Sequence, residues 1–346
     1  MDKKIKVGVL GATGSVGQKF ITLLNNHPYF EVEEIAASDK SAGKKYKDVV
    51  NWIEDAEMPK KIADKVIKLC DDKFNSKLLF SALDASVAGE IEENLANKGH
   101  IIISNAKNHR WSYAVPLIIP EVNHEHLNLI KYQKYNNGAI VTNPNCSTIG
   151  LILSIAPLHN KFGVKSINVV TLQAISGAGY PGVPSLDMID NIIPFIGGEE
   201  DKLESEPLKI LGRMDEDKII NADIKISAST NRVFVKDGHT EIVQLSFINK
   251  PTKEEILKTW EEYKSLPQEM NLPFAPVTPI KYFDNEKYPQ PRLHKSIDKG
   301  MAAITGRLRE CNLFDYKYVV LSHNTIRGAA GGTILIAEIM YKKRMI

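Results

Sequence analysis

The 346-residue sequence has few cysteines, no long apolar run and no excess of one charge. Its three cysteines, Cys70, Cys146 and Cys311, are an odd number at wide spacings, so they offer neither a disulfide framework nor a zinc site. A reducing compartment such as the cytoplasm is the expected location. No stretch reaches the roughly 18 apolar residues of a membrane-spanning helix. The N-terminal stretch up to Leu10 predicts a strand, not a signal peptide.

The charges are nearly balanced, with 44 basic and 42 acidic side chains and a formal net charge of +2. Such a balance argues against nucleic acid or an anionic membrane surface as the main partner. Hydrophobic residues make up 43% of the chain, so a core of ordinary size can be buried without the support of disulfides or structural metals. The length allows two domains.

The first 150 residues alternate short apolar runs with helical patterns, which predicts βαβ units and a parallel sheet. A helix is expected from Val16 to Asn26, and another from Cys146 to His159, with Ser147 and Thr148 capping its first turn. The strands are predicted at Ile5–Leu10, Glu31–Ala37, Leu78–Ala82, Ile101–Ser104 and Ala139–Thr142.

Beyond about residue 160 longer β-rich runs appear, which predict a mixed or antiparallel sheet in a second, α+β domain. We expect a dinucleotide-binding domain over residues 1–148 and a second domain over 149–324. The helical pattern from Thr333 to Lys343 predicts a C-terminal helix, within about 325–346, that packs back on the first domain. The proline-rich span Pro267–Pro279 is interpreted as a surface loop. The runs that predict the second sheet are Ser166–Ala174, Ile224–Val235, Thr240–Ile248, Met301–Leu308 and Tyr318–Ser322.

A glycine-rich turn follows the first predicted strand and opens the first predicted helix. Glycines in this position allow a tight turn and let backbone amides approach a pyrophosphate at the positive end of the helix. The end of the second strand should meet the adenosine ribose, where Ser38, Lys40 and Ser41 favour the 2′-phosphate of NADP, whereas Asp39 favours NAD. The turn residues expected to bind the cofactor are Gly11, Thr13, Gly14, Ser15 and Val16.

Cys146 stands between a strand and the start of a helix, where a helix dipole lowers the pKa of a thiol and favours a nucleophilic thiolate. A small buried core residue is the equally weighted alternative from local sequence alone. A nucleophile needs a base, and His239 follows an Asp-Gly turn at the end of a strand that also carries Arg232. From spacing alone, His239 is only a plausible choice among nine histidines.

Together these residues resemble the aspartate-β-semialdehyde dehydrogenases, in the branch found in archaea and fungi. The resemblance extends through nearly the whole chain, in a fixed order of segments. They are residues 11–17, 104–106 with Arg110, 119–123, 143–148, 173–179, 232–239, 289–292 and 323–331. The family implies a Rossmann domain with NADP as cofactor, no metal, and a homodimer or homotetramer assembled through the sheet of the second domain.

The resemblance also implies a role for individual residues. Cys146 would be the acylated nucleophile and His239 the acid–base group, with Asn145 and Gln173 orienting the thiol and the acyl group. Arg232 would bind the substrate α-carboxylate, because its planar fork of donors suits that group. Glu199 would bind the α-ammonium, while Arg110 and Lys202 would bind phosphate. Further cofactor contacts would come from Ser81, Ser176, Gly177, Gly179 and Asn324.

The implied reaction is the NADPH-dependent reduction of aspartyl phosphate to aspartate semialdehyde, through a thioester and with release of phosphate. It serves lysine, threonine and methionine biosynthesis. The alternative is malonyl-CoA reductase, whose substrate carries no ammonium and would not need Glu199. A catalytically silent NADP-binding sensor would be expected to lose Cys146 or His239, and both are present.

Overall fold

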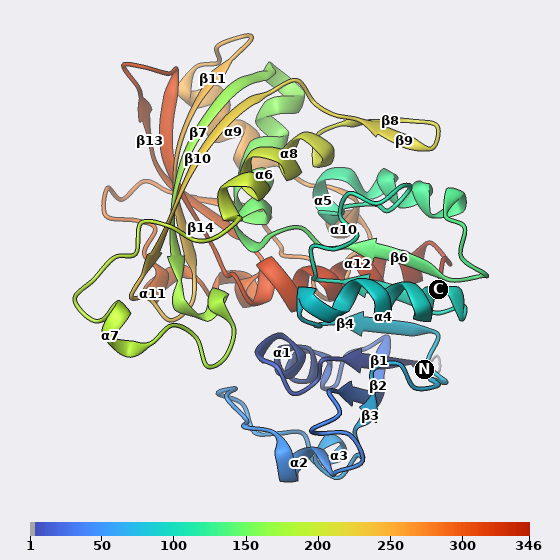
Figure 1. Ribbon diagram of the computed structural model, residues 1–346. Helices are drawn as coiled ribbons and strands as arrows, with labels where there is room; N and C mark the ends of the chain where they lie inside the picture. Colours follow the sequence, from blue (N-terminus) through green and yellow to red (C-terminus); the bar gives the residue numbers. More distant parts are fainter. Residues whose placement is uncertain (1–3) are drawn as a thin grey trace.

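The structure is a computed structural model that describes residues 4–346 (Figure 1). Two six-stranded sheets dominate it, and each has its own hydrophobic core. The first sheet is parallel throughout and the second is mixed. This confirms the predicted fold class, a Rossmann-type domain joined to an α+β domain with a mixed sheet.

The first sheet has the strand order β3-β2-β1-β4-β5-β6. Both of its faces are covered, which is why its strands are nearly continuous apolar runs. Helices α1 (Ser15–Leu24) and α12 (Gly331–Lys342) pack on one face, and α4 (Ala85–Asn97) packs on the other. The strands are β1 (Ile5–Leu10), β2 (Phe30–Ala37), β3 (Lys68–Leu69), β4 (Leu78–Ser81), β5 (Ile101–Ser104) and β6 (Ala139–Thr142).

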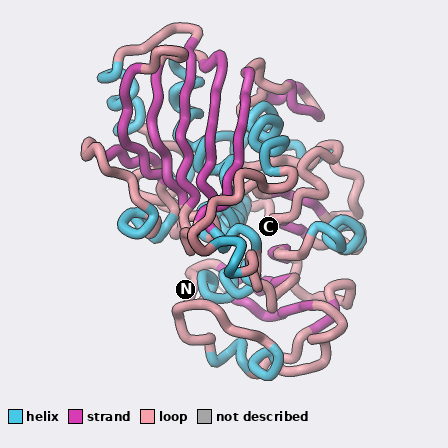
Figure 2. The backbone as a smooth tube through the Cα atoms, turned by 60° about the vertical axis from the view of Figure 1, so that its left-hand side comes forward, coloured by secondary structure: helices cyan, strands magenta, loops and turns pink. Residues whose placement is uncertain are grey.

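The second sheet has the strand order β10-β7-β11-β14-β13-β12. Helices α6 (Cys146–Phe162), α8 (Glu199–Ile210) and α9 (Lys253–Glu262) lie against one face (Figure 1). Figure 2 shows the strands of this sheet side by side, with these helices behind them. The strands are β7 (Val164–Ala174), β10 (Lys225–Val233), β11 (His239–Phe247), β12 (Ile280–Phe283), β13 (Ala303–Glu310) and β14 (Tyr316–Ser322).

Short elements connect these layers. A small hairpin, β8 (Arg213–Asp215) and β9 (Lys218–Ile220), follows α8. A π-helical turn, η4 (Ile326–Ala330), joins β14 to α12 and carries Gly328 past Cys146. The other short helices are α2 (Tyr46–Val49), α3 (Lys60–Ala63), α5 (Pro120–Asn123), η1 (His124–Tyr132), η2 (Ile175–Ala178), α7 (Ser185–Met188), α10 (Leu266–Glu269), α11 (Pro291–His294) and η3 (Ile297–Gly300).

Two local predictions are corrected by the structure. The helix that begins at Cys146 is capped by Asn145, whose side chain accepts the backbone N–H groups of Ser147 and Thr148. The hydroxyls of those two residues find no hydrogen-bond partner among residues 4–346. The span Pro267–Pro279 is not only a surface loop, because it begins with the end of α10 and buries Leu272 in the core of the first sheet.

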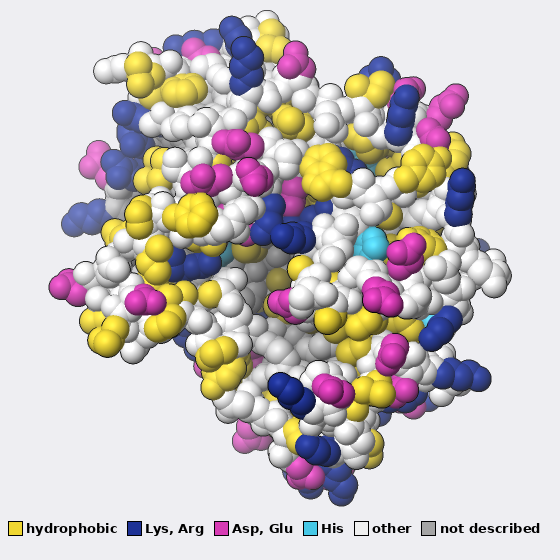
Figure 3. Space-filling model, viewed as in Figure 1, with side chains coloured by type: hydrophobic (Ala, Val, Ile, Leu, Met, Phe, Trp, Pro, Cys, Tyr) yellow, Lys and Arg dark blue, Asp and Glu magenta, His cyan; other side chains and the backbone are white. Residues whose placement is uncertain are grey.

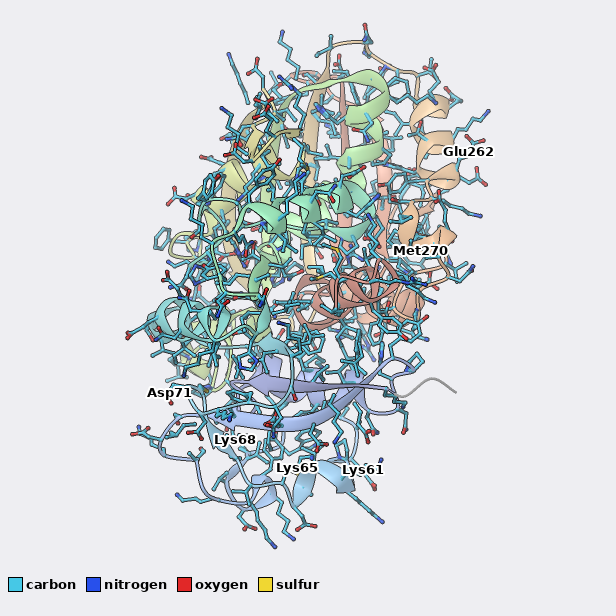
Figure 4. All side chains as sticks on the ribbon, turned by 90° about the vertical axis from the view of Figure 1, so that its right-hand side faces the viewer. Lys61, Lys65, Lys68, Asp71, Glu262 and Met270 are labelled. Atoms are coloured by element: carbon cyan, nitrogen blue, oxygen red, sulfur yellow. The ribbon has the colours of Figure 1, made fainter. Side chains whose placement is uncertain are left out.

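Charged side chains at the surface of the first domain are exposed to solvent. In Figure 4, Lys61 points away from the first sheet, and its side chain is 85% exposed while pairing with Glu31. Met270, labelled in the same view, lies beside α12, and it packs against the core of the first sheet. Over residues 4–346, no helix combines the length and the apolar composition needed to cross a membrane.

Candidate active site

A cleft of about 1100 Å³ runs between the two sheets, from the glycine-rich turn after β1 to Cys146 at the start of α6. Figure 3 shows the molecule hollowed between its upper and lower parts. Both ends of the cleft lie at the carboxyl ends of parallel strands, where doubly wound sheets bind their ligands. The fold therefore places a nucleotide-type site and a thiol in one continuous space.

The turn after β1 lines one end of the cleft with all five of the residues predicted to bind the cofactor: Gly11, Thr13, Gly14, Ser15 and Val16. Helix α1 begins here with Gly14 as its N-cap, and no side chain from residues 4–346 caps it. Amide groups at the start of a helix, left without a cap, suit a pyrophosphate.

At the end of β2, where the adenosine ribose is expected, only some of the predicted residues line the cleft. Ser38 and Asp39 line the cleft, whereas Lys40 and Ser41 follow them without reaching its walls. Asp39 accepts a hydrogen bond from the backbone N–H of Lys40 at 2.9 Å, so its carboxylate is partly engaged by its own turn. Ser81 is completely buried and outside the cleft; its backbone carbonyl accepts hydrogen bonds from Asn105.

The opposite side of the cleft brings together four of the residues that the resemblance implies as further cofactor contacts. Asn324 donates from its side-chain amide to the Ser176 hydroxyl at 2.8 Å and accepts the backbone N–H of Gly238 at 2.9 Å. At Gly177 a Cβ atom would lie only 2.9 Å from a guanidinium nitrogen of Arg232. Glycine at this position therefore lets the η2 turn pass directly over the reactive groups. Ser176, Gly177, Gly179 and Asn324 all line the cleft.

The thiol of Cys146 lies 3.2 Å from Nε2 of His239, across 93 residues of sequence. The other ring nitrogen, Nδ1, accepts the backbone N–H of Ala174 at 3.0 Å. An accepting Nδ1 leaves the proton of the neutral ring on Nε2, which faces the sulfur. The carbonyl of Ala174 in turn accepts a hydrogen bond from Arg232 at 2.8 Å.

Burial dominates the protonation of this pair. It raises the pKa of the Cys146 thiol to about 12, and the charge of Glu199 adds to the rise. Three cations act in the opposite direction without offsetting it: Lys202, Arg232 and Arg110. Burial, together with Arg232, lowers the pKa of His239 to about 3. These shifts favour a neutral thiol beside a neutral imidazole, and the net shift of the thiol pKa is upward, opposite to the lowering expected from the helix N-terminus alone.

Glu199 forms a polar centre beside the thiol. One carboxylate oxygen accepts from Lys202 at 2.5 Å, and the other accepts from Asn145 at 2.8 Å and from Gln173 at 3.3 Å. Burial acts to raise the pKa of Glu199, but Lys202 and the two amides outweigh it, and the net shift is downward. Glu199 is thus a carboxylate that holds a cation, and both Glu199 and Arg232 line the cleft.

Arg110 reaches the same end of the cleft from the loop after β5. Its guanidinium donates to Glu206 at 2.6 Å and to the carbonyl of Asn105 at 2.9 Å. Glu206 was not among the residues predicted from the sequence. A signal was present: Glu206 falls seven residues after Glu199, so it shares the same face of a helix.

The fold and the site together define a class: a dinucleotide-dependent dehydrogenase with a cysteine and a histidine in contact at the end of the cofactor cleft. Comparison with known proteins narrows this class. Residues 6–130 match the family model for the NAD binding domain of semialdehyde dehydrogenase, and residues 155–327 match the model for its dimerisation domain.

Curated relatives agree over the full length. The aspartate-semialdehyde dehydrogenase of Archaeoglobus fulgidus is 48% identical, covering 99% of this chain and 100% of its own, and that of Saccharomyces cerevisiae is 47% identical, with 99% of each chain covered. The crystal structure of the Candida albicans enzyme with NADP superposes with a TM-score of 0.92 at 43% identity, covering 99% of this chain and 100% of that one. The chain belongs to the semialdehyde dehydrogenase family, among the aspartate-semialdehyde dehydrogenases.

Proposed function

We propose that this chain catalyses the NADPH-dependent reduction of L-4-aspartyl phosphate to L-aspartate 4-semialdehyde, with release of phosphate. The observation that carries this proposal is the contact of Cys146 with His239 at the end of a cleft that begins at the glycine-rich turn. The relatives support this reading and not the malonyl-CoA reductase alternative. Glu199 supports it too, because a buried carboxylate suits an α-ammonium.

In the proposed chemistry, the sulfur of Cys146 attacks the acyl carbon of aspartyl phosphate, the bond from that carbon to the phosphate oxygen breaks, and the proton of the thiol ends on the released phosphate. A thioester and free phosphate result. NADPH, when bound, would supply the hydride that reduces the thioester. The carbon–sulfur bond of the resulting thiohemiacetal then breaks, which frees the semialdehyde and the thiol.

We assign His239 the role of a hydrogen-bond donor in the reaction, in place of the acid–base role that the family resemblance implies. With its proton on Nε2, the ring donates a hydrogen bond to the thiolate and then to the oxygen of each tetrahedral intermediate. To take the proton of the thiol itself, the ring would have to shift to the other tautomer and lose the N–H of Ala174. The donor role therefore fits this hydrogen-bond arrangement better.

The remaining polar groups divide between the two ends of the substrate. Arg232 and Glu199 would hold the α-carboxylate and the α-ammonium, and Gln173 would orient the acyl group beside Asn145. An incoming ammonium would replace the Lys202 ammonium on Glu199, because both compete for the same oxygen. Lys202 would then be free to join Arg110 at the phosphate.

The cofactor is proposed to lie with its pyrophosphate on the turn at Gly14 and its 2′-phosphate beside Ser38, with Lys40 and Ser41 close to it. The structure of the 43% identical Candida albicans enzyme was solved with NADP. Because Asp39 already accepts a hydrogen bond from its own turn, it opposes a phosphate less than a free carboxylate would. NADP is therefore favoured over NAD.

We further propose a homodimer or homotetramer formed through the uncovered face of the second sheet. On that face Val170 pairs with Ile242, and Ile242 pairs with Val319, so half-exposed apolar side chains form a continuous stripe. The matched dimerisation model spans this sheet. Sedimentation velocity should give the mass of at least two chains, and a monomer at micromolar concentration would contradict the assembly.

The three unpaired cysteines support a reducing compartment such as the cytoplasm.

The central experiment is a phosphate-dependent NADP reduction assay with aspartate semialdehyde, run beside NADPH oxidation with malonyl-CoA. We expect turnover with the first substrate only. Cys146→Ala should lower kcat by about 10⁴-fold or more while NADP still binds, because the covalent step is lost and the cofactor end is untouched. Cys311→Ala, in the turn after β13, is the matched control. Turnover by the Cys146→Ala variant would refute the thioester, and a preference for malonyl-CoA would refute the substrate.

A further inference from the structure

Helix α8 presents an unusual face to the active site. Four charged residues, Glu199, Lys202, Glu206 and Lys209, recur at spacings of three, four and three, where an amphipathic helix would place its apolar stripe. The first two line the cleft, but Glu206 and Lys209 lie deeper, 1% and 7% exposed. Burying two more charges is costly, so their partners should show what they are for.

Both oxygens of the Glu206 carboxylate are used, and they hold two different parts of the site. One accepts from Arg110 at 2.6 Å, and the other accepts the backbone N–H of Asn145 at 2.8 Å. Asn145 is the N-cap of α6 and directly precedes Cys146. A single carboxylate therefore spans the distance between the proposed phosphate ligand and the peptide that carries the thiol.

Lys209 adds a second anchor from the next turn of the same helix. Its ammonium donates to the carbonyl of Arg110 at 2.6 Å and to the carbonyl of Val115 at 2.9 Å. Helix α8 thus fixes both the side chain and the backbone of Arg110. Within the loop after β5, this arginine is held through the carbonyl groups of Asn105 and Lys107.

The N–H donors of Arg110 that have no protein partner indicate a role in binding a phosphate group. A guanidinium has five N–H donors, and two of them are taken by Glu206 and Asn105. Nε of Arg110 is buried, with no partner among residues 4–346, while the residue itself lines the cleft. An oriented guanidinium with unused donors is the arrangement that binds a phosphate group through more than one bond.

We propose that Glu206 is a positioning residue of the reaction: it sets the spacing between Arg110 at the phosphate and Cys146 at the acyl carbon. This inference rests on the proposed phosphate role of Arg110. The bond that breaks joins the acyl carbon to the phosphate oxygen, so attack by the thiol requires both ends of that bond to be held at once. A displacement of about 1 Å in such an arrangement can cost about 10²-fold in rate.

The test is the Glu206→Gln variant. Its amide keeps the size of the carboxylate but turns an NH₂ group toward one of the two donors, so one hydrogen bond is lost. We expect kcat/KM for phosphate to fall about 10²-fold, with NADP affinity close to that of the parent. The thermal unfolding midpoint should fall as well, because the buried guanidinium of Arg110 loses its counter-ion. Glu204→Gln is the matched control, because Glu204 lies on the same helix but accepts from the backbone of Ala228. It should behave as the parent does.

A double-mutant comparison separates positioning from a merely structural effect. If Glu206 acts through Arg110, then adding Glu206→Gln to Arg110→Ala should change kcat/KM for phosphate by less than about threefold. Equal losses in both backgrounds would overturn the inference. So would an unimpaired Glu206→Gln enzyme, provided that Arg110→Ala alone is impaired with phosphate. If Arg110→Ala alone is not impaired, the phosphate role proposed above fails instead.

Should Glu206→Gln not fold, Glu206→Asp serves in the same comparison. It keeps the charge but is one methylene too short to reach both donors. The expected loss again falls on phosphate and again disappears in the Arg110→Ala background. A loss that persists there, or full activity of the Asp variant, overturns the inference.

Discussion

Two helices of this protein begin in equivalent places and are used in opposite ways. Helix α1 follows β1 and helix α6 follows β6, both at the carboxyl edge of the same parallel sheet. Helix α1 starts at Gly14 with no side-chain cap from residues 4–346, whereas Asn145 caps α6 by accepting two of its first backbone N–H groups. The uncapped end is suited to bind a ligand's anion, and the capped end is suited to present a side chain.

This difference explains why the pKa of Cys146 is raised, although a thiol at a helix N-terminus is expected to have a lowered pKa. The amides that would stabilise a thiolate already donate to Asn145, and Glu199 places a negative charge nearby. Burial adds the largest contribution and keeps the thiol protonated. A helix dipole acts over about one turn and is modest in size, so a buried neighbourhood readily outweighs it.

The largest expected effect comes from giving α1 the kind of cap that α6 has. In Gly14→Asp the new carboxylate would accept the first amides of α1 and repel the pyrophosphate. We expect the NADP dissociation constant to rise about 100-fold or more, measured by fluorescence titration, since each charge-assisted hydrogen bond contributes about 1.5–3 kcal/mol. Gly14→Ala is the control, because a Cβ there would lie 3.5 Å from its nearest neighbour, the Gly11 carbonyl oxygen. Equal NADP affinities of the two variants would contradict the claim that the uncapped N-terminus of α1 binds the pyrophosphate.

A smaller effect concerns the pH dependence of thiol reactivity at the start of α6. The thiolate is the reactive form, and its fraction rises tenfold per pH unit below the pKa. With the pKa raised to about 12, the alkylation rate of Cys146 by iodoacetamide should rise about tenfold per unit from pH 7 to pH 9, without levelling off. Mass spectrometry can follow each cysteine separately in the same sample.

Cys311 provides the internal reference for that experiment. Slight burial acts to raise its pKa, but hydrogen bonds from the backbone of Leu313 and Phe314 outweigh this and lower the pKa. Its alkylation should therefore level off at a lower pH than that of Cys146. A plateau for Cys146 below pH 8 would show that the helix end lowers the thiol pKa after all.

The smallest expected effect is on stability. Asn145→Ala removes the cap of α6 and should lower the free energy of unfolding in urea by about 1 kcal/mol. Thr252→Ala removes the comparable cap of α9, on the second sheet, and should cost about the same. Only the Asn145 variant should also lose activity, because Asn145 contacts Glu199. Equal activities would mean that the cap of α6 is purely structural.

Local patterns in the sequence predicted much of the fold. The strands β1, β5 and β6 begin and end where the apolar runs do, because strands that are covered on both faces are mostly apolar. The short strands β3 and β12 were not predicted. Their few residues carry little periodicity, and each strand lies at the end of its sheet in the described part of the chain. The domain boundary after residue 148 and the individual residue roles remain predictions.

The sequence by itself determined the order of elements, the glycine-rich turn and the family, since these depend on neighbouring residues and on motifs in a fixed order. Only the tertiary structure decided the state of Cys146 and the place of Glu206. The charged groups that act on the pKa of this thiol lie on α8, on β10 and in the loop after β5, 36 or more residues away along the chain, and their effect depends on burial and on distance. No local pattern encodes those two quantities, because packing alone sets them.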